Sequence, residues 1–182
     1  LARVNPYRTL RSVVRFRPIE TDRLERRLAK AASVADLRAI ARRRLPRGVF
    51  DYLDGGAEDE RTLAANEAAF AAVDWRPRVL NEVEDIDVGS TLLGQPLAYP
   101  LVLAPVGFPR LLHPDGELAA ARAAERAGLP YTLSTMSSRS IEEVAAASTG
   151  PRWFQLYVNE DAAFTRRLVA RAEEAGYEAT AA

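Results

Sequence analysis

Short apolar runs alternate with alanine-rich segments from about residue 101 onward, and this rhythm restricts the fold more than any other feature of the sequence. The strand-like runs are LVLAP (101–105), YTLS (131–134), RWFQLYV (152–158) and the start of a fourth, YEATAA (177–182). The helical patterns lie between them, at residues 116–128, 140–148 and 161–176. Strands that alternate with helices of this length predict βαβ units with right-handed crossovers, and therefore a parallel sheet.

The loop after the first predicted strand distinguishes between the two common forms of such a sheet. This loop, APVGFPRLLHPDGE (104–117), is too long and has the wrong glycine spacing for the dinucleotide fingerprint of an open, doubly wound sheet. The stretch GSTLLG (89–94) also lacks the Lys-Ser/Thr ending of a phosphate-binding P-loop. We therefore predict an α/β fold of the TIM (β/α)8 barrel type, of which the first three βα units and the start of the fourth strand are present.

The residues before this rhythm have a different pattern and are predicted to be helical first and β-prone afterwards. The predicted helices are one that Ser33 and Asp36 cap, one from near Pro46 to Gly55, and one over residues 58–72. The β-prone pieces are DWRPRVL (74–80) and IDVGSTLLGQPLAYP (86–100). These patterns divide the chain into a basic arm (1–32), a preamble (33–95) and the first part of a barrel (96–182).

Charge is distributed unevenly along the chain, although its sum is zero. Residues 1–48 contain 14 Arg or Lys and 4 Asp or Glu, which leaves 11 of the 25 basic and 21 of the 25 acidic residues for 49–182. The basic arm suits nucleic acid, an anionic lipid surface or an acidic neighbouring subunit, but a solvated or subunit-packing arm is the commoner explanation. Because the arm has no recognised nucleic-acid-binding motif, we expect no nucleic-acid partner and leave a peripheral membrane contact open.

Cysteine usage and hydropathy narrow the classes of function further. The chain has no cysteine, which excludes disulfides, thiolate metal sites and a cysteine nucleophile, and fits a cytoplasmic protein without a metal. The most apolar segment, residues 96–108, contains three prolines and is shorter than the ~20 residues of a spanning helix. The first residues lack the apolar core of a secretory signal, and a chain that starts with Leu is not expected to be a complete translation product.

The run RWFQLYV contains polar side chains, which a strand that is buried entirely in the hydrophobic core would not require. In a strand, Trp153, Gln155 and Tyr157 share one face, and Phe154, Leu156 and Val158 share the other. Active sites of barrels form where the strands end, and here the ends offer Ala104–Gly107, Ser134–Met136, Gln155 and Tyr157. This uncharged set suits the polar edge of a flat heteroaromatic ring. A structural explanation is equally open: a core glutamine, a turn serine and a core tyrosine with its hydroxyl at the rim.

Several separate motifs then occur in the order of one known family. These motifs are LPRGVFDYLDGGAEDERTLAANEAAF, PLVLAPVGF, HPDGELAAARAAERAGLPYTLSTMSSRSIEEVA, RWFQLYV and ARAEEAGYEA. Over about residues 33–179 the chain resembles the FMN-dependent α-hydroxy acid dehydrogenase and oxidase family, which includes L-lactate dehydrogenase, glycolate oxidase and mandelate dehydrogenase. The resemblance implies a TIM-barrel enzyme that oxidises an L-2-hydroxy acid to the 2-keto acid, and a homo-oligomer of four or more subunits.

The resemblance also implies roles for individual residues around the cofactor. Pro105, Val106 and Gly107 match the segment whose backbone passes along the flavin ring of FMN near its reactive centre. Ser134 and Gln155 match residues that bond the polar edge of the isoalloxazine.

Three further matches concern the substrate. Tyr52 matches the tyrosine that binds the substrate carboxylate, and Tyr157 matches the catalytic-site tyrosine whose hydroxyl faces the substrate near the flavin. At ordinary tyrosine pKa values neither is a credible base, so both are expected to orient the substrate. Met136 occupies a pocket position where glycolate oxidase has tryptophan and lactate dehydrogenases have a smaller aliphatic residue, which favours L-lactate over glycolate and leaves mandelate open.

Parts of the family's machinery have no match in this sequence. The catalytic histidine, the substrate arginines, the lysine beside the flavin and the phosphate-binding glycines belong to the second half of the family's barrel. His113 stands in a His-Pro loop that the family does not use as its base, and we expect a structural role for it. We therefore expect the 182 residues alone to be inactive and colourless.

Two other classes of function remain open at this point. One is a non-catalytic half-barrel that pairs with a partner through open strand edges, which are a liability when left bare. The other is a different FMN-barrel enzyme, such as glycolate oxidase, mandelate dehydrogenase or a flavin-dependent isomerase. Tyr52 and its helix count against the isomerase. The sequence does not decide among oxygen, quinone and cytochrome as electron acceptor.

Overall fold

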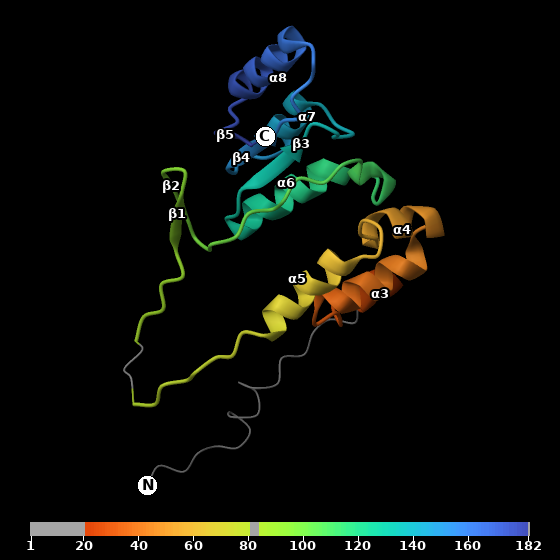
Figure 1. The fold of residues 1–182 in the computed structure, drawn as a ribbon, viewed down its shortest axis with the longest axis vertical. Helices are drawn as coiled ribbons and strands as arrows, with labels where there is room; N and C mark the ends of the chain where they lie inside the picture. Colours follow the sequence, from red (N-terminus) through yellow and green to blue (C-terminus); the bar gives the residue numbers. More distant parts are fainter. Residues whose placement is uncertain (1–20, 81–83, 182) are drawn as a thin grey trace. The chain divides into compact units, whose positions relative to one another are not determined.

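A computed structural model describes residues 21–80 and 84–181 of the chain (Figure 1). The chain divides into two compact units, one up to Gly55 and one from Gly56 onward, and each is described by itself. The first twenty residues of the predicted basic arm lie outside the described part. No helix in the part of the chain that the structure describes is long and apolar enough to cross a membrane.

The described part of the first unit, from residue 21 onward, contains three short helices. They are α2 (Arg23–Leu28), α3 (Val34–Arg44) and α4 (Arg47–Asp54). The predicted capping box is confirmed, since the Ser33 hydroxyl accepts from the Asp36 amide and the Asp36 carboxylate accepts from the Ser33 amide. Pro46 precedes α4 as predicted, and the paired Arg38 and Asp54 side chains tie α3 to α4.

The second unit begins with a helix and an antiparallel hairpin. Helix α5 (Arg61–Ala71) starts three residues later than the predicted range, and strands β1 (Ser90–Leu92) and β2 (Gln95–Leu97) form the hairpin. Its turn residues Leu93 and Gly94 both have positive φ angles, at 51° and 80°, as a tight primed turn requires. The β-prone piece at 74–80 forms no strand, so that part of the prediction is wrong.

After the hairpin, the described part of the second unit contains the short 3-10 helix η1 (Pro109–Leu111), followed by three parallel strands and three α-helices (Figure 1). The elements in chain order are α6 (Gly116–Ala127), β3 (Tyr131–Ser134), α7 (Ile141–Ala147), β4 (Arg152–Gln155), α8 (Ala162–Glu174) and β5 (Ala179–Ala181). The sheet order β3-β4-β5 follows the chain, and α6 contacts α7, which contacts α8. Neighbouring strands joined by right-handed crossovers place their helices on one face, as in a section of a barrel. The predicted α/β class with a parallel sheet is confirmed.

The segment 101–105 was predicted to be a buried strand, and the structure contradicts this. Leu103 makes only an isolated parallel bridge with Tyr131, and Leu101 is 59% exposed. Pro100 and Pro105 on either side lack amide hydrogens. Within the described residues no strand lies on the far side of this segment, so it has a partner on one side only.

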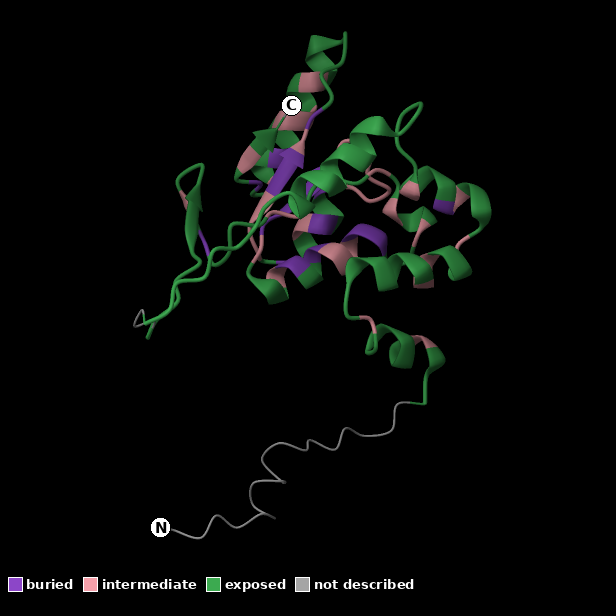
Figure 2. Ribbon diagram, turned by 60° about the horizontal axis from the view of Figure 1, so that its bottom comes forward, coloured by how far each residue is buried: buried purple, intermediate pink, exposed green. Residues whose placement is uncertain are grey.

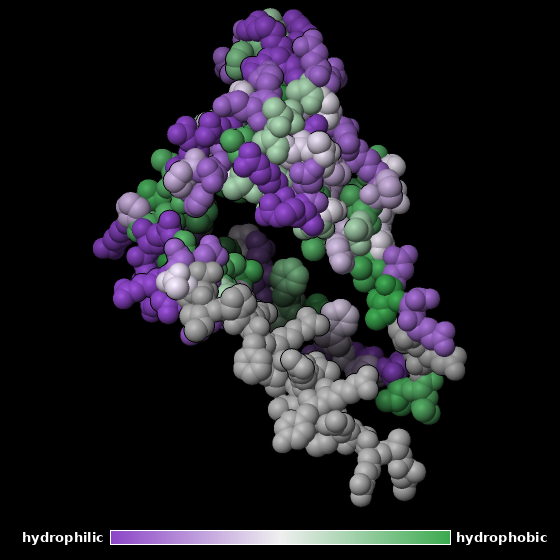
Figure 3. All heavy atoms as spheres, turned by 180° about the vertical axis from the view of Figure 1, so that it is seen from behind, coloured by the Kyte–Doolittle hydropathy of each residue, from purple (hydrophilic) through white to green (hydrophobic). Residues whose placement is uncertain are grey.

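The core of the second unit lies between the strands and the three helices (Figure 2). Its buried members are Ala121, Ala124, Tyr131, Leu133, Ile141, Val144, Phe154, Leu156, Ala172 and Tyr177. Small alanine side chains on α6 allow that helix to approach the sheet closely. The outward surface of α8 is hydrophilic (Figure 3), and its Arg166, Arg167 and Glu173 are exposed.

The alternation predicted for RWFQLYV holds only as far as Leu156. Phe154 and Leu156 belong to the helix-side core, whereas Trp153 and Gln155 do not, as predicted. The Leu156 amide still bonds the Ala181 carbonyl at 2.7 Å. Val158, however, is 72% exposed, so its placement on the packing side is wrong. The chain leaves the sheet because the next amide, that of Tyr157, donates to the Thr135 hydroxyl instead of a strand.

Candidate functional site

Ser134 and Gln155 end their strands side by side and face away from the helices. They are register partners in the parallel pairing of β3 with β4, and neither belongs to the helix-side core. We call these two strand ends, with the loops 104–108 and 135–139, the carboxyl edge. Parallel strands bring the ends of distant segments together in this way, and active sites of barrel folds form at this edge.

Hydrogen bonds fix the orientation of the Gln155 carboxamide. Its Oε1 accepts from the Ser134 hydroxyl at 3.2 Å and from the Thr135 backbone amide at 3.3 Å. Since a backbone N–H can only donate, the atom facing it is the oxygen. Within the described residues, the NH2 group of Gln155 meets no hydrogen-bond acceptor. The carboxyl edge therefore presents a fixed and unused donor.

Thr135 ties the two strand ends together, a role that the sequence did not reveal. Its hydroxyl donates to the Gln155 carbonyl at 2.6 Å and accepts from the Tyr157 amide at 3.0 Å. Its own amide also reaches the Gln155 carbonyl at 3.0 Å. These bonds set the position of Gln155 and the direction in which the chain continues to Tyr157.

The loop 104–108 lies against the loop after β3. The Phe108 amide donates to the Met136 carbonyl at 3.0 Å, and the Met136 amide donates to the Ser134 hydroxyl at 3.1 Å. Pro105 and Val106 are exposed and Gly107 is half-buried. The structure thus brings the predicted ring-contacting segment and the predicted ring-edge residues into one hydrogen-bonded set.

The side chains predicted to meet the substrate are exposed. Met136 is 42% and Tyr157 60% exposed, and both follow the strand ends of the carboxyl edge. Tyr52, 62% exposed, lies on α4 in the first unit, so its match to the family tyrosine stays a prediction. His113 accepts the Asp115 amide on Nδ1 at 3.2 Å in the turn before α6, which agrees with the structural role expected for it.

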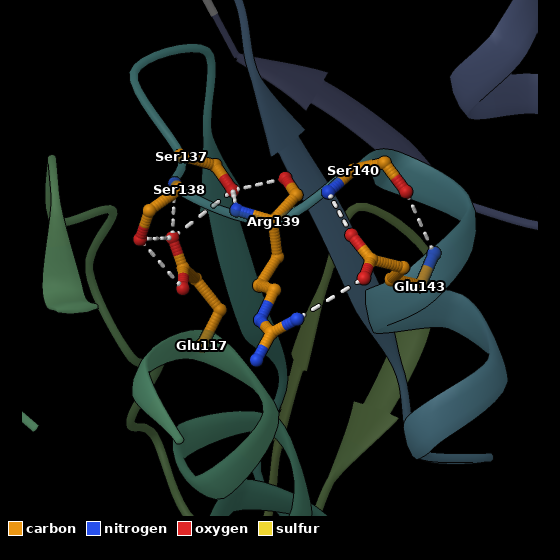
Figure 4. Close-up of polar contacts among 6 residues, drawn as sticks. All are labelled: Glu117, Ser137, Ser138, Arg139, Ser140 and Glu143. Carbon is orange, nitrogen blue, oxygen red and sulfur yellow. Dashed lines mark hydrogen bonds and ion pairs between the residues drawn. The ribbon is translucent and has the colours of Figure 1, made fainter. Parts of the chain in front are cut away.

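Glu117 accepts hydrogen bonds from the loop after β3 (Figure 4). The sequence analysis did not identify this residue. Its side chain is fully buried, and its carboxylate accepts from the Ser137 hydroxyl and from the amide and hydroxyl of Ser138. Burial acts to raise the pKa of Glu117, but hydrogen bonds from its own amide, Ser138 and Ser137 outweigh it and hold the pKa below the ordinary value. The carboxylate is therefore ionised at neutral pH.

The donors of the carboxyl edge fit the polar edge of a flavin ring. An isoalloxazine presents carbonyl oxygens and a ring N–H, which match the NH2 of Gln155 and the hydroxyl of Ser134. None of Pro105, Val106, Gly107, Ser134 and Gln155 carries a charge, which suits an uncharged heteroaromatic ring edge.

The comparisons with known proteins agree with this geometry. The family model described as FMN-dependent dehydrogenase matches residues 41–182, and the chain belongs to this family. The chain is 50% identical over 145 residues to an L-lactate dehydrogenase of Caulobacter vibrioides, covering 80% of this chain and 38% of that protein. It is 46% identical over 149 residues to glycolate oxidase of Spinacia oleracea, covering 82% of this chain and 40% of that protein.

A solved structure extends the comparison to three dimensions. A mandelate oxidase crystal structure with 3,3-difluoro-2-hydroxy-3-phenylpropionic acid superposes with a TM-score of 0.78 at 47% identity, covering 82% of this chain and 45% of that chain. The chain spans about two fifths of the length of the curated relatives it matches. The expected family is thereby confirmed, and the roles of the individual site residues stay predictions.

Proposed function

We propose that this chain forms the first part of an FMN-dependent enzyme that oxidises an L-2-hydroxy acid to the 2-keto acid. The observation that carries the proposal is the oriented Gln155 carboxamide beside Ser134 at the carboxyl edge, whose NH2 group has no acceptor in the part of the chain that the structure describes. FMN, when bound, supplies the acceptor for the two electrons that leave the substrate. In this proposal Pro105, Val106 and Gly107 line the ring, and Ser134 and Gln155 bond its polar edge.

The proposed barrel is a continuation of the sheet beyond the described strands. Its support is the sheet order, which follows the chain from Leu103 through β3 and β4 to β5 without a reversal. A doubly wound sheet contains such a reversal, whereas a barrel does not. The mandelate oxidase superposition supports the same arrangement.

L-lactate is the substrate that we propose, with glycolate and mandelate as alternatives. Met136 is a flexible, unbranched side chain that stands 42% exposed beside the strand ends, and in this proposal it adapts to the methyl group of lactate. The exposed hydroxyl of Tyr157 is then available to orient the substrate next to the ring. The whole enzyme also needs a base and cations for the carboxylate, which we assign to no residue of this chain.

An anaerobic reduction experiment tests this function. The purified gene product that contains this chain is expected to be yellow and to lose its visible flavin absorbance on addition of L-lactate. Glycolate and L-mandelate are expected to act more slowly, and D-lactate not at all. A bound flavin that none of these acids reduces would contradict the proposal. Faster reduction by glycolate or mandelate would keep the reaction class and replace the substrate.

A further inference from the structure

Glu117 is the one fully buried carboxylate among the described residues, and it lies outside the site proposed above. A buried charge is costly unless it is fully hydrogen-bonded, so its position in a structure has a reason. Besides its own amide, the donors to its carboxylate come from one loop, through Ser137 and Ser138 (Figure 4). The question is what the ordering of this loop achieves.

The bonds of Glu117 continue into both loops of the carboxyl edge. The Ser138 hydroxyl, which Glu117 holds at 2.8 Å, also accepts the Arg110 amide at 3.2 Å. Arg110 belongs to the short helix η1 (Pro109–Leu111) that directly follows the loop 104–108. One carboxylate therefore fixes the loop after β3 and, through Ser138, the end of the loop that carries Pro105–Gly107.

Gly116 shows that this arrangement requires a close approach. It has a positive φ of 47°, and an added Cβ would lie 2.8 Å from the Arg110 Cγ and 3.2 Å from the Arg110 backbone nitrogen. Only glycine adopts this backbone without strain and leaves that space. The start of α6 is thus shaped to bring Glu117 beneath the two loops.

We infer that Glu117 is a positioning residue that holds the loops 104–108 and 135–139 at the spacing needed for the flavin ring, an inference that rests on the proposed function. It touches neither ring nor substrate. It acts through Ser138 and Met136, since the Met136 carbonyl bonds Phe108 and its amide bonds Ser134. Its loss is expected to loosen the ring site without removing any group that contacts the ring.

The same helix supplies a matched control. Glu125, about two turns further along α6, caps the loop before β4 in the same manner, accepting from the amide of Thr149 at 3.0 Å and from its hydroxyl. That loop lies at the other end of the strands and carries no proposed site residue. Glu117→Gln and Glu125→Gln both retain side-chain size and both remove a carboxylate that caps a loop.

The test compares these two variants in the full-length gene product. For Glu117→Gln we expect about a 10-fold rise in the FMN dissociation constant, since charge-assisted hydrogen bonds to the loop are weakened. We also expect a shifted visible flavin spectrum and faster hydrogen exchange of the Thr135, Met136 and Phe108 amides. For Glu125→Gln we expect wild-type values of all three. Ser138→Ala, which leaves the carboxylate but breaks the link to Arg110, is expected to reproduce part of the Glu117→Gln effect.

Two results would overturn the inference in distinguishable ways. A wild-type protein that binds no FMN would overturn the proposed function and this inference with it. A wild-type protein that binds FMN, together with a Glu117→Gln variant whose affinity, spectrum and amide exchange match those of Glu125→Gln, would overturn only the inference. Glu117 would then be a structural residue like Glu125.

Discussion

The two ends of the parallel sheet use the same device with different side-chain burial. At the carboxyl edge, the fully buried Glu117 accepts bonds from the loop after β3. At the opposite end, which we call the amino edge and define by Arg152 and the loop 148–150, the partly exposed Glu125 accepts bonds from Thr149. Both glutamates come from α6, so one helix fixes a loop at each edge of the sheet.

The difference supports the carboxyl edge as the proposed ligand-binding edge. At the amino edge the Arg152 guanidinium donates through Nη1 to the carbonyls of Ser148 at 2.5 Å and Gly150 at 3.1 Å, and its Nε, which has no partner within the described residues, is buried away from the surface. At the carboxyl edge the Gln155 carboxamide uses its oxygen and keeps its NH2 group unused within the described residues. A donor that is fixed in place but unpaired is what a preorganised binding site needs.

The largest effect is expected from Phe154, because both edges depend on the core beneath it. Its ring is 2% exposed and lies edge-on to the Tyr177 ring, with centroids 6.2 Å apart. Phe154→Ala is expected to lower the free energy of unfolding by about 3–5 kcal/mol, measured by chemical denaturation. Phe164→Ala, at a position 40% exposed on α8, is the control and should cost less than about 1 kcal/mol. Equal losses would show that the core does not lie where we place it.

Gln155→Leu tests whether FMN affinity depends on the carboxyl edge and not on the amino edge. The substitution retains the approximate volume and leaves the Ser134 hydroxyl and the ring edge of FMN without their partner. We expect about a 100-fold rise in the FMN dissociation constant, measured by fluorescence titration. Arg152→Gln, at the amino end of the same strand, is the control and should lower stability while leaving FMN affinity within about twofold, because it affects only the amino edge. An unchanged affinity in Gln155→Leu would remove Gln155 from the site.

Two tyrosines sharpen the contrast between site and core. Tyr157→Phe removes an exposed hydroxyl and is expected to lower kcat/KM for L-lactate about 10-fold with stability unchanged within about 0.5 kcal/mol. Tyr177→Phe removes a buried hydroxyl that donates to the Ile141 carbonyl at 3.0 Å. It is expected to cost about 1–2 kcal/mol of stability and to leave kcat/KM unchanged. A loss of stability in Tyr157→Phe and a loss of kcat/KM in Tyr177→Phe would contradict the assignment of Tyr157 to the site and Tyr177 to the core.

The smallest effect concerns the helix surface and affects neither edge. Arg171 donates two hydrogen bonds of 2.8 Å to Glu142 and, with the Glu142 amide and Ser140 adding to its effect, lowers the pKa of that carboxyl to about 2. A lowered folded-state pKa gives stability that is present above the ordinary value and is lost as the pH falls toward 2. Because the pair is solvent-exposed, Glu142→Gln should lower the free energy of unfolding by less than about 1 kcal/mol at pH 7. Near pH 2, where Glu142 is protonated, the substitution should have no effect on stability. A cost that persists at low pH or high salt would show that packing, and not charge, is lost.

Local patterns in the sequence predicted most of the helices and strands, because capping residues and period-two runs act over a few residues. Ser33, Gly128 and Ser140 all stand where helices begin or end. The strand at 101–105 and the inward placement of Val158 were wrong, because they depend on whether a neighbouring strand offers hydrogen bonds. Hydropathy carries no information on that pairing.

The site was predictable as residue types and not as a network. Gln155 and Ser134 were identified as polar groups at strand ends, and their register pairing agrees with that expectation. Glu117 was missed, and Thr135 was listed only as one of the strand-end residues without its linking role, because an acidic residue at a helix start and a threonine in a turn have ordinary local explanations. The one available signal for Glu117 was the run STMSSRS, which supplies several hydroxyl donors in the next loop.

The most direct test of the central claim is a crystal structure of the full-length gene product with FMN bound. We expect the polar edge of the isoalloxazine to lie within hydrogen-bond distance, about 2.7–3.2 Å, of the Gln155 side-chain nitrogen. We also expect the ring along Pro105–Gly107 and no contact between FMN and Glu117. An isoalloxazine bound away from the carboxyl edge, with Gln155 paired to protein groups alone, would contradict the central claim.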